Sequence, residues 1–227
     1  MTDPPGTVRT SAMSNLQAFL TDLRANAWRT EGARFNAARR LRRRDWFATF
    51  SIGIFSAFGI GVSFVQKVYE ATAGTPADKY LTALSVCLGL FVIVISLIEW
   101  GASGSVKAES LYQNAQELNA FQRKLAQVLA EIDGGRVLVA DEVTEFREEY
   151  ERIKGGCAHN HEPVDDQLFL AQQRFNTDFS TLFRRPKPSW LEATWRKAQS
   201  ALSVVWYFGL FWIVVCGLLW VTPWSGT

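Results

Sequence analysis

Residues 155–166 hold the side chains of this 227-residue chain that are best suited to chemistry, including both of its histidines. A thiol, two imidazoles and two carboxylates lie close together there, and such groups bind zinc and other transition metals: Cys157, His159, His161, Asp165 and Asp166. The Cys-x-His-x-His spacing, however, matches no recognised structural zinc pattern. We favour the interpretation that Asn160 or His161 caps a helix beginning at Pro163, whose first turn the two aspartates complement. A metal hydrolase centred on Cys157, His159, His161 and Asp165 is the alternative hypothesis.

Other catalytic patterns are missing from the sequence, which contains no Gly-rich phosphate loop, no Gly-x-Ser-x-Gly elbow and no His-Glu-x-x-His pair. We therefore predict no enzymatic activity, no catalytic residue, no cofactor and no metal. Cys87 and Cys216 lie in apolar runs, so only Cys157 lies in a polar segment. We accordingly expect no intrachain disulfide framework, as suits a reducing compartment.

Two long uncharged runs dominate the elements that must position these residues. They are residues 46–66 and residues 80–98, and the segment 67–79 between them contains the helix breakers Gly74 and Pro76. At about 1.5 Å rise per residue, each run spans roughly 30 Å as a helix, which is the thickness of a bilayer's hydrocarbon core. Backbone polar groups cannot go unpaired in lipid. We therefore predict a transmembrane helical hairpin, in preference to a helical hairpin buried in a soluble protein.

An Arg-rich segment fixes the expected orientation of this hairpin. Residues 1–13 are expected to form a flexible tail and residues 14–45 an amphipathic helix, capped by Ser14, that leads directly into the first apolar run. The end of that helix carries five arginines: Arg39, Arg40, Arg42, Arg43 and Arg44. By the positive-inside rule this flank is cytoplasmic, which leaves the loop of the hairpin outside. The same residues could instead contact nucleic acid, but their place beside a membrane helix favours topology and anionic lipid.

Two polar or small-residue stripes run along the predicted hairpin. Gly53, Ala57 and Gly61 recur every four residues, a spacing that lets helices approach closely. The second helix carries hydroxyl and small residues on one face: Thr82, Ser85, Gly89 and Ser96. These faces either pack within the protein, which is the favoured interpretation, or line a water-filled path in an oligomer. No charge lies in the middle of a span, which argues against a transporter.

Residues 105–183 are predicted to form a cytoplasmic bundle of three helices. The first carries a seam at four-then-three spacing and ends at Asp133: Leu111, Ala115, Leu118, Leu125, Leu129 and Ile132. The second repeats the spacing and ends at the glycine pair 155–156: Val139, Val143, Phe146, Tyr150 and Ile153. Pro163 opens the third, with a stripe of its own: Leu168, Gln172, Phe175, Phe179 and Leu182. No strand-like alternation of any length occurs.

Residues 184–201 are predicted to form a basic linker followed by an interfacial helix, in which Ser189 and Glu192 match a capping box. Residues 202–222 then form a third predicted span, with basic residues on its N-terminal side that place this side in the cytoplasm: Arg184, Arg185, Lys187, Arg196 and Lys197. The expected fold is an all-α membrane protein with the N-terminus inside and the C-terminus outside.

The order of these elements, together with several short motifs, resembles the SLATT family of bacterial two-transmembrane effector domains. An Arg-rich lead-in at 34–40 enters the hairpin, and a later helix opens with Tyr112, Gln113 and Asn114. The most specific part is an arrangement of six residues: Tyr150, Ile153, Asn160, His161, Val164 and Asp165. The resemblance covers about residues 14–183, and the third span is similar to longer members, including a branch found beside reverse transcriptases. Asp166 departs from the family pattern, which has an aromatic residue there.

The resemblance implies an effector of a bacterial antiviral or conflict system, located in the inner membrane. Such a protein is expected to form a homo-oligomer and to permeabilise the membrane when a nucleotide-synthesising, nucleotide-sensing or reverse-transcriptase partner triggers it. Direct nucleic-acid binding is not expected. The alternative is a membrane-anchored adaptor that recruits a cytoplasmic enzyme through the acidic helix of its bundle: Asp141, Glu142, Glu145, Glu148, Glu149 and Glu151.

Overall fold

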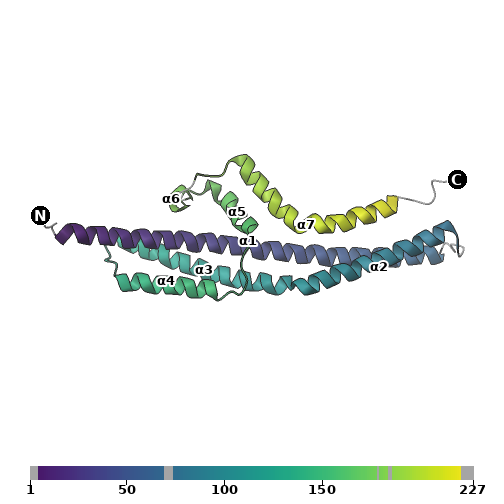
Figure 1. Cartoon of the computed structure of the whole chain (residues 1–227), viewed down its shortest axis with the longest axis horizontal. Helices are drawn as coiled ribbons and strands as arrows, with labels where there is room; N and C mark the ends of the chain where they lie inside the picture. Colours follow the sequence, from purple (N-terminus) through teal and green to yellow (C-terminus); the bar gives the residue numbers. More distant parts are fainter. Residues whose placement is uncertain (1–4, 69–73, 178, 184–185, 221–227) are drawn as a thin grey trace. The chain divides into compact units, whose positions relative to one another are not determined.

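The computed structural model describes residues 5–68, 74–177, 179–183 and 186–220, and every regular element within them is a helix (Figure 1). The all-α prediction is therefore confirmed for the described part of the chain. The elements, in order, are α1 (Pro5–Val68), α2 (Pro76–Ala102), α3 (Gly104–Asp133), α4 (Ala140–Gly155), α5 (Pro163–Gln172), the 3-10 turn η1 (Gln173–Phe175), α6 (Phe179–Phe183) and α7 (Trp190–Trp220).

These helices form two compact units. The bundle unit comprises residues 1–39 and 107–200, and the hairpin unit comprises residues 40–106 and 201–227. Three helices, α1, α3 and α7, contribute residues to both units. Helix α1 begins at Pro5, ahead of the Ser14 start that the sequence predicts, while residues 1–4 of the expected tail lie outside the described part.

The hairpin unit pairs the second part of α1 with α2, which runs back alongside it (Figure 1). Near the loop, Gln66 Nε2 donates to Asp78 Oδ1 at 2.5 Å and to Thr82 Oγ1 at 3.1 Å. At the opposite end, Arg44 Nε donates to Glu99 Oε1 at 3.0 Å. Helix α2 starts at Pro76 because Thr75 Oγ1 caps it by accepting the Asp78 N–H at 3.3 Å. The predicted hairpin is thus held by polar contacts at both ends.

Apolar packing in the hairpin unit includes the C-terminal part of α7. Seven side chains form its buried core: Ala48, Phe55, Leu84, Leu88, Ile95, Phe208 and Val215. Trp212 Nε1 donates to Ser51 Oγ at 3.2 Å, and the Tyr80 hydroxyl donates to the Leu218 carbonyl. Large apolar side chains also remain exposed on both helices of the hairpin, among them Ile60, Phe64, Leu90, Ile93 and Leu97.

Two helical stretches, Met13–Val68 and Pro76–Asp133, are long and apolar enough to cross a membrane. The third predicted span, 202–222, is bent in the structure: α7 changes direction by 59° between its segments Trp190–Trp206 and Phe208–Trp220, and residues 221–222 lie outside the described part. At about 1.5 Å per residue, the second segment alone is shorter than a bilayer's hydrocarbon core of roughly 30 Å. Helix α7 is therefore long enough to be a third span only if its two segments cross the membrane as one bent helix.

In the bundle unit, the first part of α1 packs with α3 and α4 (Figure 1). The predicted seam of α3 is buried, since its leucines and Phe121 contact Leu20, Leu23 and Ala27 of α1. On α4, the predicted stripe is buried at Val143, Phe146 and Tyr150. Val139 departs from that stripe: it precedes the helix and is exposed. The breaks also lie where expected, with Ser103 ending α2 at a φ of +48° and α4 ending beside Gly156.

The third bundle helix is shorter than the sequence predicts. Helix α5 ends at Gln172 and gives way to η1, after which Asn176 adopts an extended backbone (φ −68°, ψ 134°). Because this residue interrupts the helix, the predicted stripe does not continue, and Phe175 is 81% exposed. Phe179 and Phe183, which follow in α6, pack instead with Phe169 of α5.

Helix α5 docks on α1 through a close approach at Gly32. A Cβ built at Gly32 would lie 2.0 Å from Phe169 Cδ2, so only glycine leaves room for this ring. The ring is enclosed, with its centroid 5.4 Å from that of Trp28 and 6.1 Å from that of Phe183. The absence of a side chain at residue 32 therefore determines where α5 sits.

Substitution Gly32→Ala is expected to lower the thermal stability of the full-length protein in mild detergent. The added methyl group collides with Phe169, at a cost of about 1–3 kcal/mol for overpacking, which exceeds the gain of up to about 1 kcal/mol from helix propensity. Gly155→Ala is the matched control, since a Cβ there meets nothing within 4 Å. Thermal unfolding monitored by circular dichroism measures both, and an unchanged midpoint for Gly32→Ala would contradict the close contact.

Candidate functional site

The bundle unit buries several polar side chains in addition to its apolar core. Arg34 is 3% exposed and Asp165 is fully buried, and Asn36 and Asn114 are buried as well. Burying a charged or amide group is costly unless hydrogen bonds replace the lost water. The partners of these four residues therefore show which elements must meet.

Arg34 ties α1 to α3 and to the end of α4. Its Nη1 donates to Asn114 Oδ1, and its Nη2 donates to the Lys154 carbonyl at 3.1 Å. Asn114 Nδ2 in turn donates to the Ile153 carbonyl at 2.6 Å. Carbonyls in the last turn of a helix have no partner within the helix and carry the negative end of its dipole, which suits a guanidinium. Burial lowers the pKa of Arg34, although an arginine stays charged at neutral pH.

Asn36 joins α1 to the start of α5. Its Nδ2 donates to the Asp165 carbonyl at 3.1 Å and to Gln172 Oε1 at 3.2 Å. The Asp165 carboxylate itself points back along the chain, where Oδ2 accepts the Glu162 N–H at 3.0 Å.

The cap of α5 differs from the prediction. Its N-cap residue is Glu162, so neither Asn160 nor His161 is the cap. Asn160 Oδ1 accepts only the N–H of the next residue, His161, at 2.9 Å. Asp165, in the first turn of the helix, instead bonds to the N-cap residue: its carboxylate accepts the Glu162 N–H and its own N–H donates to the Glu162 carbonyl, both at 3.0 Å.

Asp166 forms a bidentate ion pair with Arg29 of α1. Arg29 Nε donates to Asp166 Oδ1 and Nη2 donates to Oδ2, both at 2.6 Å. This fork-to-fork geometry is the strongest form of an arginine–carboxylate contact. The hydrogen bonds to Asp166 raise the pKa of Arg29, because they favour its charged form. The Asp166 carboxylate thus has a specific partner in this chain.

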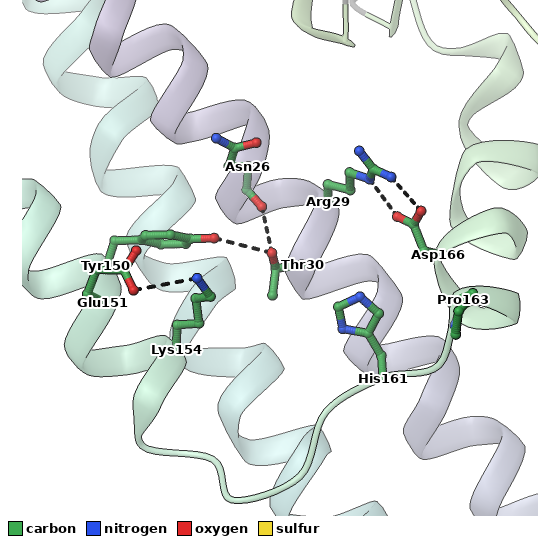
Figure 2. A pocket seen from close by; sticks show the side chains of 9 residues that line it. All are labelled: Asn26, Arg29, Thr30, Tyr150, Glu151, Lys154, His161, Pro163 and Asp166. Carbon is green, nitrogen blue, oxygen red and sulfur yellow. Dashed lines mark hydrogen bonds and ion pairs between the residues drawn. The ribbon is translucent and has the colours of Figure 1, made fainter.

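These contacts surround a polar pocket of about 590 Å³ between α1, α4 and the start of α5 (Figure 2). The Tyr150 hydroxyl lies 3.3 Å from Thr30 Oγ1, and Lys154 Nζ lies 3.5 Å from Glu151 Oε2. The lining carries two cations, Arg29 and Lys154, and two carboxylates, Glu151 and Asp166, so these charges balance. The other lining residues are Asn26, Thr30, Tyr150, His161 and Pro163. A small polar molecule that exchanges hydrogen bonds with both kinds of charge fits such a lining.

His161 stands at this pocket as a neutral side chain. Its Nδ1 is buried and has no hydrogen-bond partner among the described residues. Burial is the main reason that the pKa of His161 is lowered; Arg34 and Arg29 lower it further, while Asp166 and Asp165 oppose the shift. The lowered pKa favours the uncharged form of the imidazole.

The side chains singled out as metal ligands are separated in the structure. Cys157 Sγ lies 3.4 Å from Ser110 Oγ, whereas Asp165 accepts the Glu162 N–H and Asp166 binds Arg29. Within the described ranges, no three His, Cys, Asp or Glu side chains converge in a way that could hold a metal ion.

The two stripes of the hairpin occupy different surroundings. Thr82 accepts from Gln66, Ser85 Oγ lies 3.5 Å from Ser63 Oγ, and Ser96 Oγ donates to the Val92 carbonyl of its own helix. The small residues Gly53, Ala57 and Gly61 are exposed. A Cβ at Gly53, Gly61 or Gly89 would meet no described atom within 4 Å. The hydroxyl groups therefore take part in contacts within the chain, while the α1 stripe is open.

One protein-family model matches a stretch that includes most of these elements. The family model described as "SMODS and SLOG-associating 2TM effector domain family 5" matches residues 16–221, which is most of the chain. The chain belongs to the SLATT family. The match extends over α7, beyond the 14–183 range in which the motifs resemble the family. No curated protein and no solved structure matches the chain significantly.

The structure places two residues of the SLATT-like motif, Tyr150 and His161, at the pocket. Ile153 supplies a carbonyl to Asn114, and the Asp165 carboxylate accepts the Glu162 N–H at the start of α5. Val164 is half-buried and Asn160 is exposed. Sequence reasoning missed Arg29, Arg34, Asn36 and Asn114 as site residues, and it singled out Asp166 without its partner Arg29. Of these, Arg34, Asn36 and Asn114 were noted only within the runs that carry the resemblance, which is the signal that could have found them.

Substitution Asn114→Ala is expected to destabilise the protein by about 1–3 kcal/mol, because it leaves the buried Arg34 guanidinium without one of its acceptors. Gln113→Ala is the matched control: Gln113 is exposed and its Nε2 donates to Glu109 of its own helix at 3.1 Å, so the expected change is within about 0.5 kcal/mol. Thermal unfolding in mild detergent measures both variants. Equal losses would show that the Arg34 network contributes nothing beyond helix propensity.

Acidification is expected to weaken the wild-type protein through His161. Because the folded-state pKa of His161 lies below its ordinary value of 6.5, its contribution to stability is fully present above that value and is lost as the pH falls through it toward the folded-state pKa. His161→Gln should lose less stability than the wild type between about pH 7.5 and pH 5.5. Thermal midpoints at the two pH values measure this, with His159→Gln as the control expected to respond like the wild type. Parallel pH responses of His161→Gln and the wild type would contradict the assignment.

Proposed function

We propose that this SLATT protein is an effector that assembles in the inner membrane and permeabilises it when a partner or nucleotide signal acts on its bundle unit. Family membership supports a membrane effector of conflict systems. The observation that carries the finer proposal is the open α1 stripe of Gly53, Ala57 and Gly61, on a helix long and apolar enough to span a bilayer. In lipid, helices associate through such small residues, because their backbones can approach closely. A second copy of the chain is the partner that this face suits.

The polar pocket is where we propose that the signal acts. Its wall at α5 is held by Arg29–Asp166 and by Phe169 beside Gly32. A bound molecule that competes with Asp166 for Arg29, or with Glu151 for Lys154, would change how firmly α5 is held on α1. Helix α1 contributes to both the bundle unit and the hairpin unit, which gives a change at the pocket a covalent connection to the spans.

The proposed orientation places the bundle unit in the cytoplasm, with the N-terminus inside and the C-terminus outside. The five arginines from Arg39 to Arg44 support it through the positive-inside rule. The proposed activators are a nucleotide-synthesising, nucleotide-sensing or reverse-transcriptase partner, as the family association with SMODS and SLOG proteins favours.

A membrane-anchored adaptor is the second candidate function. It is favoured by the exposed acids of α4, among them Asp141, Glu145, Glu148 and Glu151. In this alternative the acidic face binds a basic surface of a cytoplasmic enzyme, and the hairpin serves only to hold the complex at the membrane.

Ala57→Leu is expected to abolish depolarisation of cells that express the full chain with the products of its neighbouring genes during phage challenge. The added bulk blocks close approach at the α1 stripe. Phe58→Leu, at an exposed apolar position beside it, is the matched control and should retain the wild-type response. A potential-sensitive dye measures the effect, with immunoblotting to confirm that each variant reaches the membrane. Intact membrane potential with wild-type protein present, together with capture of a partner by α4, would replace the effector proposal by the adaptor.

A further inference from the structure

The hairpin unit contains a second pocket, of about 360 Å³, at the end of the hairpin opposite its loop. One part of its lining is polar and cationic, from Arg40 and Arg44 of α1 and Ser203 of α7. The rest is apolar or aromatic: Leu41, Ile98, Val204 and Trp206. All three helices of the unit contribute, so the pocket exists only where α1, α2 and α7 meet.

The Arg-rich run divides into two groups around this pocket. Arg40 and Arg44 lie one helical turn apart, on one face of α1, and both are half-buried. Arg39, Arg42 and Arg43 are exposed. The five arginines that the sequence treats as one topological signal therefore include two that also line a cavity.

An acidic group near the pocket sets the balance of charge. Glu99 Oε1 accepts from Arg44 Nε at 3.0 Å, which offsets part of the charge of Arg44 and holds its guanidinium in place. Glu99 is not part of the lining. Arg40 and Arg44 therefore both face the pocket as cations, and the bond to Glu99 positions the guanidinium of Arg44.

The position of the pocket along the helices corresponds to the surface of a bilayer. It lies where the uncharged run of α1 begins, at Trp46 directly after Arg44 and Asp45, and where that of α2 ends, at Ile98. Lipid phosphates lie at this level, and their acyl chains begin immediately beside it. Tryptophan is also enriched at this level, as Trp206 illustrates here.

We propose that an anionic phospholipid occupies this pocket, with its headgroup phosphate on Arg40 and Arg44 and its glycerol and first methylenes against Leu41, Ile98 and Val204. Arginine presents a planar fork of donors that matches a phosphate, and basic pockets between membrane helices bind anionic headgroups. A free phosphate would use the cationic part alone and leave the apolar part unfilled. The lipid joins α7 to the hairpin, and the proposal does not require that the protein permeabilise the membrane.

The test compares Arg40→Gln with Arg42→Gln, which removes the same charge from an exposed position two residues away. The full-length protein, delipidated in mild detergent, is titrated with phosphatidylglycerol at an ionic strength of about 0.5 M, where contacts of exposed charges are largely screened. Binding is followed by native mass spectrometry and by the thermal midpoint. The wild type and Arg42→Gln should bind alike, and Arg40→Gln about tenfold more weakly.

Further arms separate the sources of the phosphate. Phosphatidylcholine, inorganic phosphate and glycerol 3-phosphate should each raise the thermal midpoint much less than phosphatidylglycerol does. Arg40→Lys keeps the charge without the planar fork, so its affinity for phosphatidylglycerol should lie between those of Arg40→Gln and the wild type. It replaces Arg40→Gln as the test variant if that variant fails to fold. Equal weakening by Arg40→Gln and Arg42→Gln, or equal stabilisation by inorganic phosphate and phosphatidylglycerol, would overturn the proposal.

Discussion

The buried charge of Arg34 is the constraint around which the bundle unit is arranged. A guanidinium that stays protonated cannot be placed in a helical interior unless acceptors surround it. Asn114 of α3 and the Lys154 carbonyl of α4 provide them, so one side chain of α1 determines how two other helices approach it. The pocket then follows, because the end of α4 is held against α1 at the level where Arg29 and Asp166 hold the start of α5.

The hairpin unit depends on a different force. Its core is small, and many large apolar side chains of α1 and α2 face outward. In water such a surface would be costly, whereas in lipid it costs nothing, and only the polar ends need partners from the chain. Gln66 with Asp78 at one end and Arg44 with Glu99 at the other supply those partners. Polar contacts therefore specify how the helices of the bundle unit pack, whereas a bilayer would surround the exposed apolar side chains of the hairpin unit.

The sequence predicted the elements whose signals are local. Two uncharged runs indicated the hairpin, and Pro76, Pro163 and the glycines after Lys154 indicated where helices begin or end. It missed features that depend on residues far apart. The early end of α5 and the bend in α7 leave the apolar pattern almost unchanged, so periodicity does not register them. The Cys and His residues between 157 and 161 indicated a possible metal site because they are close in the chain, but among the described residues they do not converge with other ligands.

The candidate site was harder to predict for the same physical reason. A buried polar residue such as Arg34 or Asn36 looks like a surface residue in a hydrophobicity pattern, since its position inside depends on acceptors that the fold brings together later. Arg29 and Asp166 are separated by 137 residues. For Arg34, Asn36 and Asn114, the resemblance to the SLATT family was the sequence signal, and it gave no role to their side chains.

Helix α4 has a further consequence for how the chain folds. Its last carbonyls accept hydrogen bonds from Arg34, which lies 120 residues before Lys154, and from Asn114, which lies 39 residues before Ile153. Loop closure costs more entropy for a longer separation, so we expect the Asn114 bond between α3 and α4 to form before the Arg34 bond that joins α1 to α4. We also expect α4 to be only partly helical as a free peptide and to complete its final turns on docking. The bond from Arg34 to the end of α4 would then report the docking of α1.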